Sequence, residues 1–300
     1  MLNVYQQVNR NKWRSTVVIV GFVGFLTAAL WAVGQYTSGG QNYFIPALGF
    51  SLLTGLGSYW YADKVILAVS KARKPNPLEE KVFVQVAENI ARVAGIPVPR
   101  LYVIDDSAPN AFATGRDPKN AIVCVTTGLL SKLNRTELEG VIAHEISHIT
   151  HFDTRLMMVV TVMIGSIALL SDWLIRLSWG HRNNDSRNDS GILGILGFLL
   201  IILSPIIGQL IQLALSRQRE FYADAGSAML TRQPSGLISA LQLISNDPEP
   251  LEVANKATAN LYIINPFKSN IANQSLSKMA NLFNTHPPVI ERIRELEKMM

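Results

Sequence analysis

Two long stretches without a charged side chain most constrain how this chain can fold. No Asp, Glu, Lys or Arg occurs between Arg14 and Asp63, and none occurs between Asp189 and Arg217. A helix needs about 20 apolar residues to cross about 30 Å of hydrocarbon, so both stretches can contain membrane spans. Only 16% of all residues are charged, below the ~25% usual for soluble domains. Together these features predict a membrane protein.

Four apolar segments are candidates for spanning helices: Ser15–Val33, Tyr43–Tyr61, a run that begins at Leu156, and Gly191–Leu215. The first could be a signal peptide, but its length and the apolar run that soon follows favour a retained anchor. The third is the shortest, because only 16 uncharged residues precede Asp172, which is about 24 Å of helix. It either crosses with Asp172 at the far interface or re-enters on the same side.

Basic residues lie just outside the first two segments: Arg10, Lys12 and Arg14 before the first, and Lys64, Lys71, Arg73 and Lys74 after the second. By the positive-inside rule, both ends of this hairpin face the cytosol. The net charge of +5 is thereby explained by membrane orientation, and no basic stripe with interleaved aromatic residues indicates nucleic-acid binding. The single cysteine, Cys124, excludes an internal disulfide and, in an apolar run, is expected to be a core residue.

These observations divide the chain into four parts. We expect a transmembrane hairpin over residues 1–62, a cytosolic catalytic part over 63–154, a second transmembrane or partly re-entrant hairpin over 155–215, and a second cytosolic catalytic part over 216–300. The predicted fold is a mainly α membrane protein with four transmembrane helices and an α+β catalytic domain that contains a small β-sheet.

The motif with the clearest chemistry is His144-Glu145-Ile146-Ser147-His148. Apolar residues at helical spacing surround it, and Thr136 with Glu139 is predicted to form a capping box at the helix start. Residues four apart lie on one helical face, so both imidazoles can bind one zinc ion. Glu145 lies beside the metal and can take a proton from a water that the metal activates. Two ordinary surface histidines are the alternative.

A third ligand is expected from the segment Ser216–Asp224, in which Glu220 and Asp224 lie one helical turn apart. Glu220 can bind zinc directly, and Asp224 can accept the free N–H of a ligand histidine. A solvated charged face is the alternative. Two crossings, or one re-entrant hairpin, separate His148 from Glu220, so the two residues fall on the same side of the membrane in either case.

The three sequences HEISH, SRQREFYAD and Thr-His-Pro-Pro (Thr285–Pro288) together resemble the HtpX family of bacterial membrane proteases, relatives of the CAAX prenyl proteases. The resemblance covers essentially the whole chain. It implies a zincin-like catalytic domain with one zinc ion per chain on His144, His148 and Glu220, and with Glu145 as the general base. It also implies cleavage of misfolded or damaged membrane proteins at the cytosolic side of the inner (plasma) membrane.

Three further residues are candidates for handling the polypeptide substrate. Asn110 begins the first of two predicted short strands, Asn110–Gly115 and Ala121–Thr126, and an exposed edge strand could bind an extended peptide. His286 is a candidate for stabilising the oxyanion that forms on the attacked carbonyl. Arg292 could pair with an acidic group. Ordinary strand, helix-start and solvated positions are the alternatives, and His151 is not expected to be a ligand.

Three rival functions remain to be weighed. A processing protease with a lipid-tailed substrate would need a larger chamber than this chain can build alone. A transporter would need ionisable groups inside its spans, and the first, second and fourth segments have none. A catalytically dead scaffold is disfavoured because every expected catalytic position is filled. The partners expected of the protease are the lipid bilayer and polypeptides, without nucleic acid, and the sequence leaves the oligomeric state open.

Overall fold

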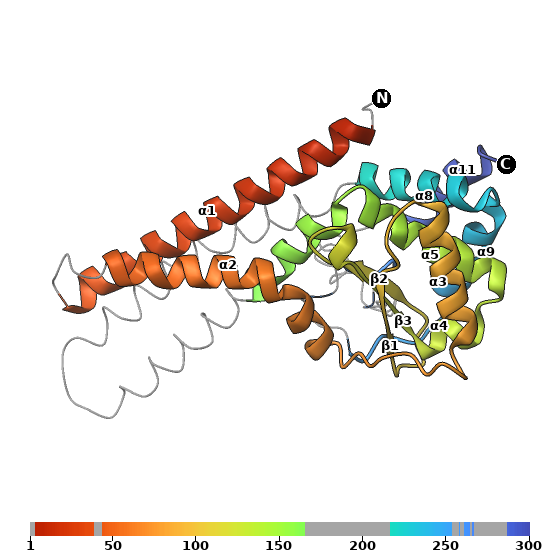
Figure 1. Cartoon of the computed structure of the whole chain (residues 1–300), viewed down its shortest axis with the longest axis horizontal. Helices are drawn as coiled ribbons and strands as arrows, with labels where there is room; N and C mark the ends of the chain where they lie inside the picture. The colour runs from red at the N-terminus through yellow and green to blue at the C-terminus, as the bar shows by residue number, and fades with distance from the viewer. Residues whose placement is uncertain are drawn as a thin grey trace, which may run out of the picture.

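The computed structural model is mostly helical, with one small mixed sheet (Figure 1). It describes residues 4–38, 44–165, 217–253, 258, 261–264, 266 and 287–300. The elements in chain order are α1 (Val4–Ser38), α2 (Phe44–Val69), α3 (Lys81–Val93), β1 (Arg100–Ile104), β2 (Ala111–Thr114), the 3₁₀ helix η2 (Pro118–Asn120), β3 (Ile122–Thr126), α4 (Thr127–Lys132), α5 (Arg135–Thr150), α8 (Arg217–Thr231), α9 (Pro234–Asn246) and α11 (Val289–Glu297). Residues 153–165 are also helical.

Helices α1 and α2 form a hairpin that extends away from the globular part (Figure 1). The two helices approach closely at Gly55, where a Cβ would lie 2.6 Å from a Val23 methyl carbon. Large apolar side chains remain exposed along the pair, including Val20 at 65%, Ile45 at 79% and Leu53 at 75%. Exposure of this many apolar side chains on one helix pair indicates that a non-aqueous medium or a partner covers them.

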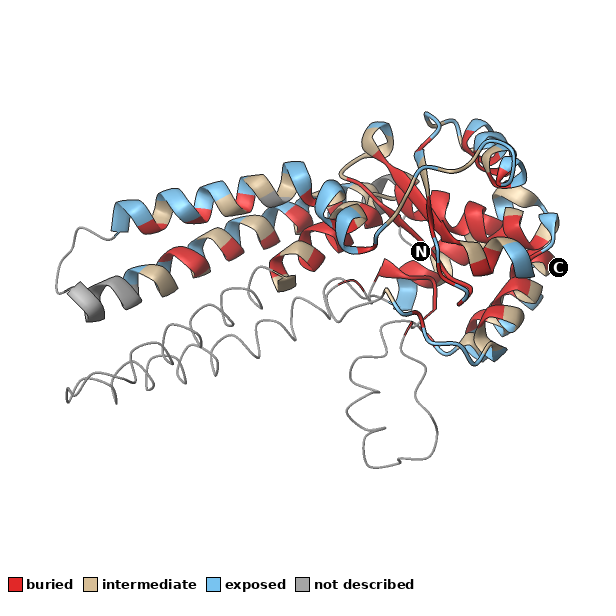
Figure 2. Ribbon diagram, turned by 90° about the horizontal axis from the view of Figure 1, so that it is seen from below, coloured by how far each residue is buried: buried red, intermediate tan, exposed pale blue. Residues whose placement is uncertain are grey.

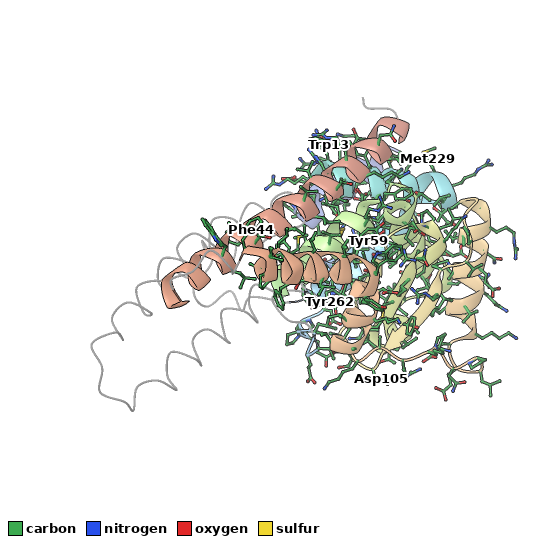
Figure 3. The ribbon with its side chains drawn as sticks, turned by 60° about the vertical axis from the view of Figure 1, so that its left-hand side comes forward. Trp13, Phe44, Tyr59, Asp105, Met229 and Tyr262 are labelled. Atoms are coloured by element: carbon green, nitrogen blue, oxygen red, sulfur yellow. The ribbon has the colours of Figure 1, made fainter. Side chains whose placement is uncertain are left out.

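Within the described residues, one helical stretch is long and apolar enough to cross a membrane, Val8–Trp31 in α1. The apolar stretch of α2, Phe44–Gly57, is shorter than a full span. Trp13 on α1 and Phe44 on α2, both labelled in Figure 3, are 68% and 48% exposed. The third predicted segment is described only as far as residue 165, and all of the fourth lies outside the described residues.

The sheet has the strand order β1-β3-β2, with β1 parallel and β2 antiparallel to the central β3. This confirms both strands that were predicted around Asn110 and Cys124. Every residue of β3 is buried, and Cys124 is fully buried as expected of a core residue. The strand order places β2 at one edge of the sheet, and β2 also contacts α5.

The outer edge of β2 is only partly open, which corrects the expectation of a fully exposed edge strand. The backbone N–H of Ile263 donates to the carbonyl of Ala111 at 2.9 Å, and Tyr262 forms an antiparallel bridge with Phe112. The Phe112 and Tyr262 rings also meet edge to face, with centroids 5.2 Å apart. Figure 3 labels Tyr262. The chain therefore covers the first half of the β2 edge with its own later residues.

Helix α5 begins two residues before the predicted capping box. Its N-cap is Asn134, whose side-chain oxygen accepts from the backbone N–H of Glu137, and Glu137 accepts from the Asn134 N–H at 2.8 Å. The prediction of Thr136 with Glu139 was therefore wrong. Asn is among the strongest N-cap residues, so the helix is capped at Asn134 and not at Thr136. Glu139 instead pairs with Arg135 on the surface.

Helix α5 runs through the centre of the globular part, where α3, α8, α9 and β2 surround it. Figure 2 shows the buried residues concentrated there, with more exposed positions along the α1–α2 hairpin. The whole run from Gly140 to Ile149 is buried. The polar motif on this helix therefore lies inside the protein, where each charged or polar side chain requires a partner.

Candidate metal centre

Three side chains of the motif on α5 are buried together. His144, Glu145 and His148 are 0%, 2% and 5% exposed. The two Nε2 atoms of the histidines lie 3.2 Å apart, with the imidazole rings nearly perpendicular. The alternative of two ordinary surface histidines is therefore excluded, because neither imidazole faces solvent.

Helix α8 brings Glu220 to the same point. Its carboxylate oxygens lie 3.8 Å from Nε2 of His144 and 3.5 Å from Nε2 of His148. The three potential ligand atoms all lie within 4.8 Å of one another. Glu220 is 6% exposed, so it does not belong to a solvated charged face. No other such group of three or more potential ligands occurs among the described residues.

His144 is oriented by Asp224, one turn after Glu220 on α8. The Nδ1 atom of His144 lies 2.9 Å from the Asp224 carboxylate. An Nδ1 proton donated to this carboxylate leaves the Nε2 lone pair free to face Glu220. Asp224 is itself held by Arg292 from α11, whose Nε and terminal nitrogen donate at 2.9 and 2.6 Å. The arrangement is the bidentate pairing that guanidinium and carboxylate favour.

His148 is oriented by a second carboxylate, that of Asp153, which was not predicted from the sequence. Nδ1 of His148 lies 3.1 Å from Oδ2 of Asp153. Asp153 is 1% exposed and begins the helix of residues 153–165. The signal that could have found it is an acidic residue five positions after His148, at the start of an apolar run where an unpaired carboxylate would be costly.

Glu145 has a strongly perturbed acidity. Burial and the nearby Glu220 raise the pKa of its carboxyl group, His148 and Arg292 oppose the rise, and the resulting pKa is about 7. A hydrogen bond from the backbone N–H of Ala113, on β2, also opposes the rise. A carboxyl group whose pKa lies near neutrality is suited to both accepting and returning a proton.

The two histidines differ in their preference for positive charge. Burial lowers the pKa of His144 to about 4, with Arg292 adding to the effect and Asp224 opposing it. Burial also lowers the pKa of His148, but Asp153, Glu220 and Glu145 outweigh it and raise the value to about 9. The pocket around His148 therefore stabilises a positive charge.

Of the predicted substrate residues, Arg292 lies at the site through its pairing with Asp224, and Asn110 lies directly before β2. Asn110 is buried, and its side-chain amide donates to the carbonyl of Ile264 at 3.1 Å. Arg292 is fully buried rather than solvated, and its third nitrogen donates to the Ile263 carbonyl at 3.1 Å. Hydrogen bonds from the Asn110 and Arg292 side chains therefore hold residues 263–264 in place beside the site. His286 lies outside the described residues, and His151 is not among the three grouped ligands.

Comparison with known proteins gives consistent matches along the whole chain. The family model described as Peptidase family M48 matches residues 77–300. "Protease HtpX homolog" of Dictyoglomus turgidum is 45% identical and covers 98% of this chain and 94% of its own length. Homologs of the same name from Thermoanaerobacter pseudethanolicus and Thermococcus sibiricus are 42% and 41% identical, covering 99% and 96% of this chain and 98% and 96% of their own lengths.

The comparison with solved structures also gives an alignment over nearly the whole chain. The crystal structure of S. mikatae Ste24p aligns with a TM-score of 0.48 at 17% identity. The alignment covers 97% of this chain but 66% of that protein, just under two thirds of its length.

Proposed function

The chain belongs to peptidase family M48 and is a metalloprotease, and from this premise we propose that it is a zinc-dependent endopeptidase of the membrane. Its substrates are polypeptides, and we propose misfolded or damaged membrane proteins among them. The observation that carries the proposal is the convergence of His144, His148 and Glu220 beside the buried Glu145.

The spacing of the donor atoms supports one zinc ion on these three residues. Four ligands arranged tetrahedrally at about 2.05 Å from zinc lie about 3.3 Å from one another. The two Nε2 atoms lie 3.2 Å apart, Oε1 of Glu220 lies 3.5 Å from Nε2 of His148, and Oε2 lies 3.8 Å from Nε2 of His144. The two nitrogens therefore already have the spacing of neighbouring zinc ligands, and the carboxylate faces both of them. Two imidazoles and one carboxylate are also a ligand set of catalytic zinc, which leaves a fourth position open.

The charges of the buried residues support a divalent cation independently. Around the two histidines, four carboxyl groups are buried with two guanidinium groups: Glu145, Asp153, Glu220 and Asp224 with Arg219 and Arg292. When all six are ionised and both histidines are neutral, as zinc ligands are, four negative charges against two positive charges leave a surplus of two, which a proton on His148 offsets in part when no metal is bound. A divalent cation would neutralise that surplus, and so much unbalanced buried charge is otherwise strongly unfavourable.

The mechanism assigns a defined task to each residue. When bound, zinc would supply a Lewis acid for the substrate carbonyl and would lower the pKa of a water held there. Glu145 accepts a proton from the attacking water and then delivers it to the leaving amine, a double role that suits its near-neutral pKa. Asp224 and Asp153 keep the Nε2 lone pairs of His144 and His148 directed at one point.

The substrate is proposed to bind as an extended strand along the outer edge of β2. Residues 262–263 cover that edge at Ala111 and Phe112, and Ala113 follows at the position that contacts Glu145. A peptide that pairs with Ala113 would therefore carry its scissile bond next to the general base. We further propose that His286 stabilises the oxyanion, whereas Asn110 and Arg292 act indirectly by holding residues 263–264 in place.

The membrane arrangement completes the proposal. The spanning stretch Val8–Trp31 and the exposed apolar side chains of α1 and α2 support an anchor in the bilayer. We propose a multi-pass protein of the bacterial inner membrane, with residues 1–62 and 155–215 as hairpins and with 63–154 and 216–300 forming the cytosolic catalytic domain. The site would then lie close to the cytosolic membrane surface.

Cleavage of casein by the full-length protein in detergent tests this function. Glu145→Gln keeps the ligands but removes the general base, so cleavage should fall by about 10²–10⁴-fold while zinc content stays unchanged. A chelator should abolish wild-type cleavage, and added zinc should restore it. Undiminished cleavage by Glu145→Gln, or cleavage that survives complete removal of zinc, would overturn the proposed mechanism.

A further inference from the structure

The turn that connects α5 to the helix of residues 153–165 is held by α1. His151 ends α5, Phe152 has a φ of 60°, and Asp153 starts the next helix. A left-handed backbone conformation is unfavourable for a bulky residue such as Phe152, so surrounding contacts must maintain it. On α1, Asn11 contacts the residues on both sides of Phe152, and the Lys12 ammonium lies 4.3 Å from the Phe152 ring centroid.

Both N–H groups of the Asn11 side chain have acceptors in this turn. Nδ2 of Asn11 donates to Oδ1 of Asp153 at 2.8 Å and to the carbonyl of His151 at 2.9 Å. Asn11 is 5% and Asp153 1% exposed, so these bonds form away from water and are costly to leave unmade. One amide therefore fixes the position of the turn and the orientation of its carboxylate.

The two carboxylate oxygens of Asp153 have different hydrogen-bond partners. Oδ1 accepts from Asn11, while Oδ2 faces Nδ1 of His148 at 3.1 Å. Rotation of the carboxylate about its Cβ–Cγ bond would break both contacts, so a bond to Oδ1 also holds Oδ2 against the imidazole. Partners of this kind set the tautomer and ring orientation of a ligand histidine, and their loss typically weakens metal binding.

We propose that Asn11 is a positioning residue of the metal centre: by holding Asp153, it keeps His148 oriented for zinc. The proposal rests on the proposed function, because it assigns a metal to His144, His148 and Glu220. Its consequence is that α1 is part of the catalytic apparatus as well as a membrane anchor.

Zinc affinity of the full-length protein in detergent, measured by competition with a chromogenic chelator, tests the proposal. Asn11→Leu has a similar volume but no donor, and it should weaken zinc binding by about threefold to tenfold, less than the 10–100-fold typical for a group bonded directly to a ligand. Thr27→Val is the matched control, because Thr27 is also buried on α1 but bonds only to Val23 of its own helix. It should leave zinc affinity unchanged.

A double-mutant cycle separates positioning from a general loss of stability. In an Asp153→Ala background, Asn11→Leu should change zinc affinity by less than about twofold, because the residue through which it acts is gone. The thermal midpoints of the metal-free variants show whether each protein is folded, and Asn11→Ala replaces Asn11→Leu if the latter does not accumulate.

The outcomes distinguish this proposal from the proposed function. If the wild type binds zinc but Asn11→Leu binds it equally well, the role of Asn11 is refuted while the protease mechanism stands. A loss of the same size with and without Asp153 refutes the coupling through Asp153. Absence of zinc binding by the wild type refutes the proposed function, and with it the role of Asn11.

Discussion

Each proposed ligand histidine is oriented by a carboxylate from a different part of the chain. Asp224 reaches His144 from α8, and Asp153 reaches His148 from the turn after α5. These two carboxylates have different neighbours. Asp224 is paired bidentately with the fully buried Arg292, and Asp153 accepts from Asn11. The two imidazoles are therefore fixed by separate contacts, so the loss of one carboxylate should leave the other histidine in place.

Substitution of Asp224 should reveal the dependence of Arg292 on its partner. Asp224→Ala leaves the buried Arg292 guanidinium with the more distant Glu220 carboxylate, 3.7 Å away, which should destabilise the protein by about 3–5 kcal/mol. The double variant Asp224→Ala/Arg292→Met removes the stranded charge and should recover part of that loss, although zinc binding stays weak. Thermal unfolding of the metal-free proteins measures both effects, and a double variant no more stable than Asp224→Ala would contradict the pairing.

At the scale of elements, the distance between α5 and α8 determines whether the three ligands meet. The helices approach closely because Gly226 lies against Ser147, where an added Cβ would come within 2.4 Å of the Ser147 Oγ. Ser227 donates to the carbonyl of Gly140 at 2.7 Å and ties the same two helices together. The packing that brings Glu220 to the histidines therefore requires small residues where the two helices touch, at Ser147, Gly226 and Ser227.

Gly226→Ala should separate these helices. The new methyl group clashes with Ser147, so we expect a destabilisation of about 1–3 kcal/mol and a lower zinc content. Adding Ser147→Ala removes the Ser147 Oγ, which is the atom closest to the new methyl group, and should restore part of the stability and part of the zinc content. Gly49→Ala in α2 is the control, since no atom lies within 4 Å of its added Cβ. Thermal midpoints and metal analysis measure the effects, and wild-type values for Gly226→Ala would show that the helices tolerate the methyl.

The sequence predicted the elements that carry local patterns and missed contacts between distant parts of the chain. The motif helix and the two short strands follow from apolar spacing, so their existence could be predicted. The start of α5 was misplaced by two residues, because Asn134 and Thr136 both fit a helix start locally. The cover over β2 by Tyr262, and the contacts of Asn11 and Arg292, depend on how segments about 70 to 150 residues apart in sequence meet, and a local sequence pattern carries no information about such contacts.

At the scale of the whole molecule, the membrane hairpin and the globular part are joined at the site. The N-terminal end of α1 contacts the turn after α5, so the hairpin meets the catalytic part next to His148. The globular part has its own core, built around α5 and the sheet. If α1 is anchored in the bilayer as proposed, this contact would hold the site next to the membrane surface.

The proposed topology can be tested with reporters in the segment between the two catalytic parts. Ser186 lies outside the described residues, and we expect a reporter fused after it to be external, because the proposed topology has one crossing before it and another after it. A reporter fused after Met300 should be cytosolic. Cytosolic activity at both positions would favour a re-entrant second hairpin.

The most direct test of the central claim is the number of zinc ions per chain in the full-length protein, purified in detergent without chelators. The account predicts one zinc ion for the wild type and for Glu145→Gln, and a much lower content for Glu220→Ala, because Glu220 is the only proposed ligand outside α5. A wild type that binds no zinc when zinc is supplied, or Glu220→Ala that retains one tightly bound zinc ion, would contradict it.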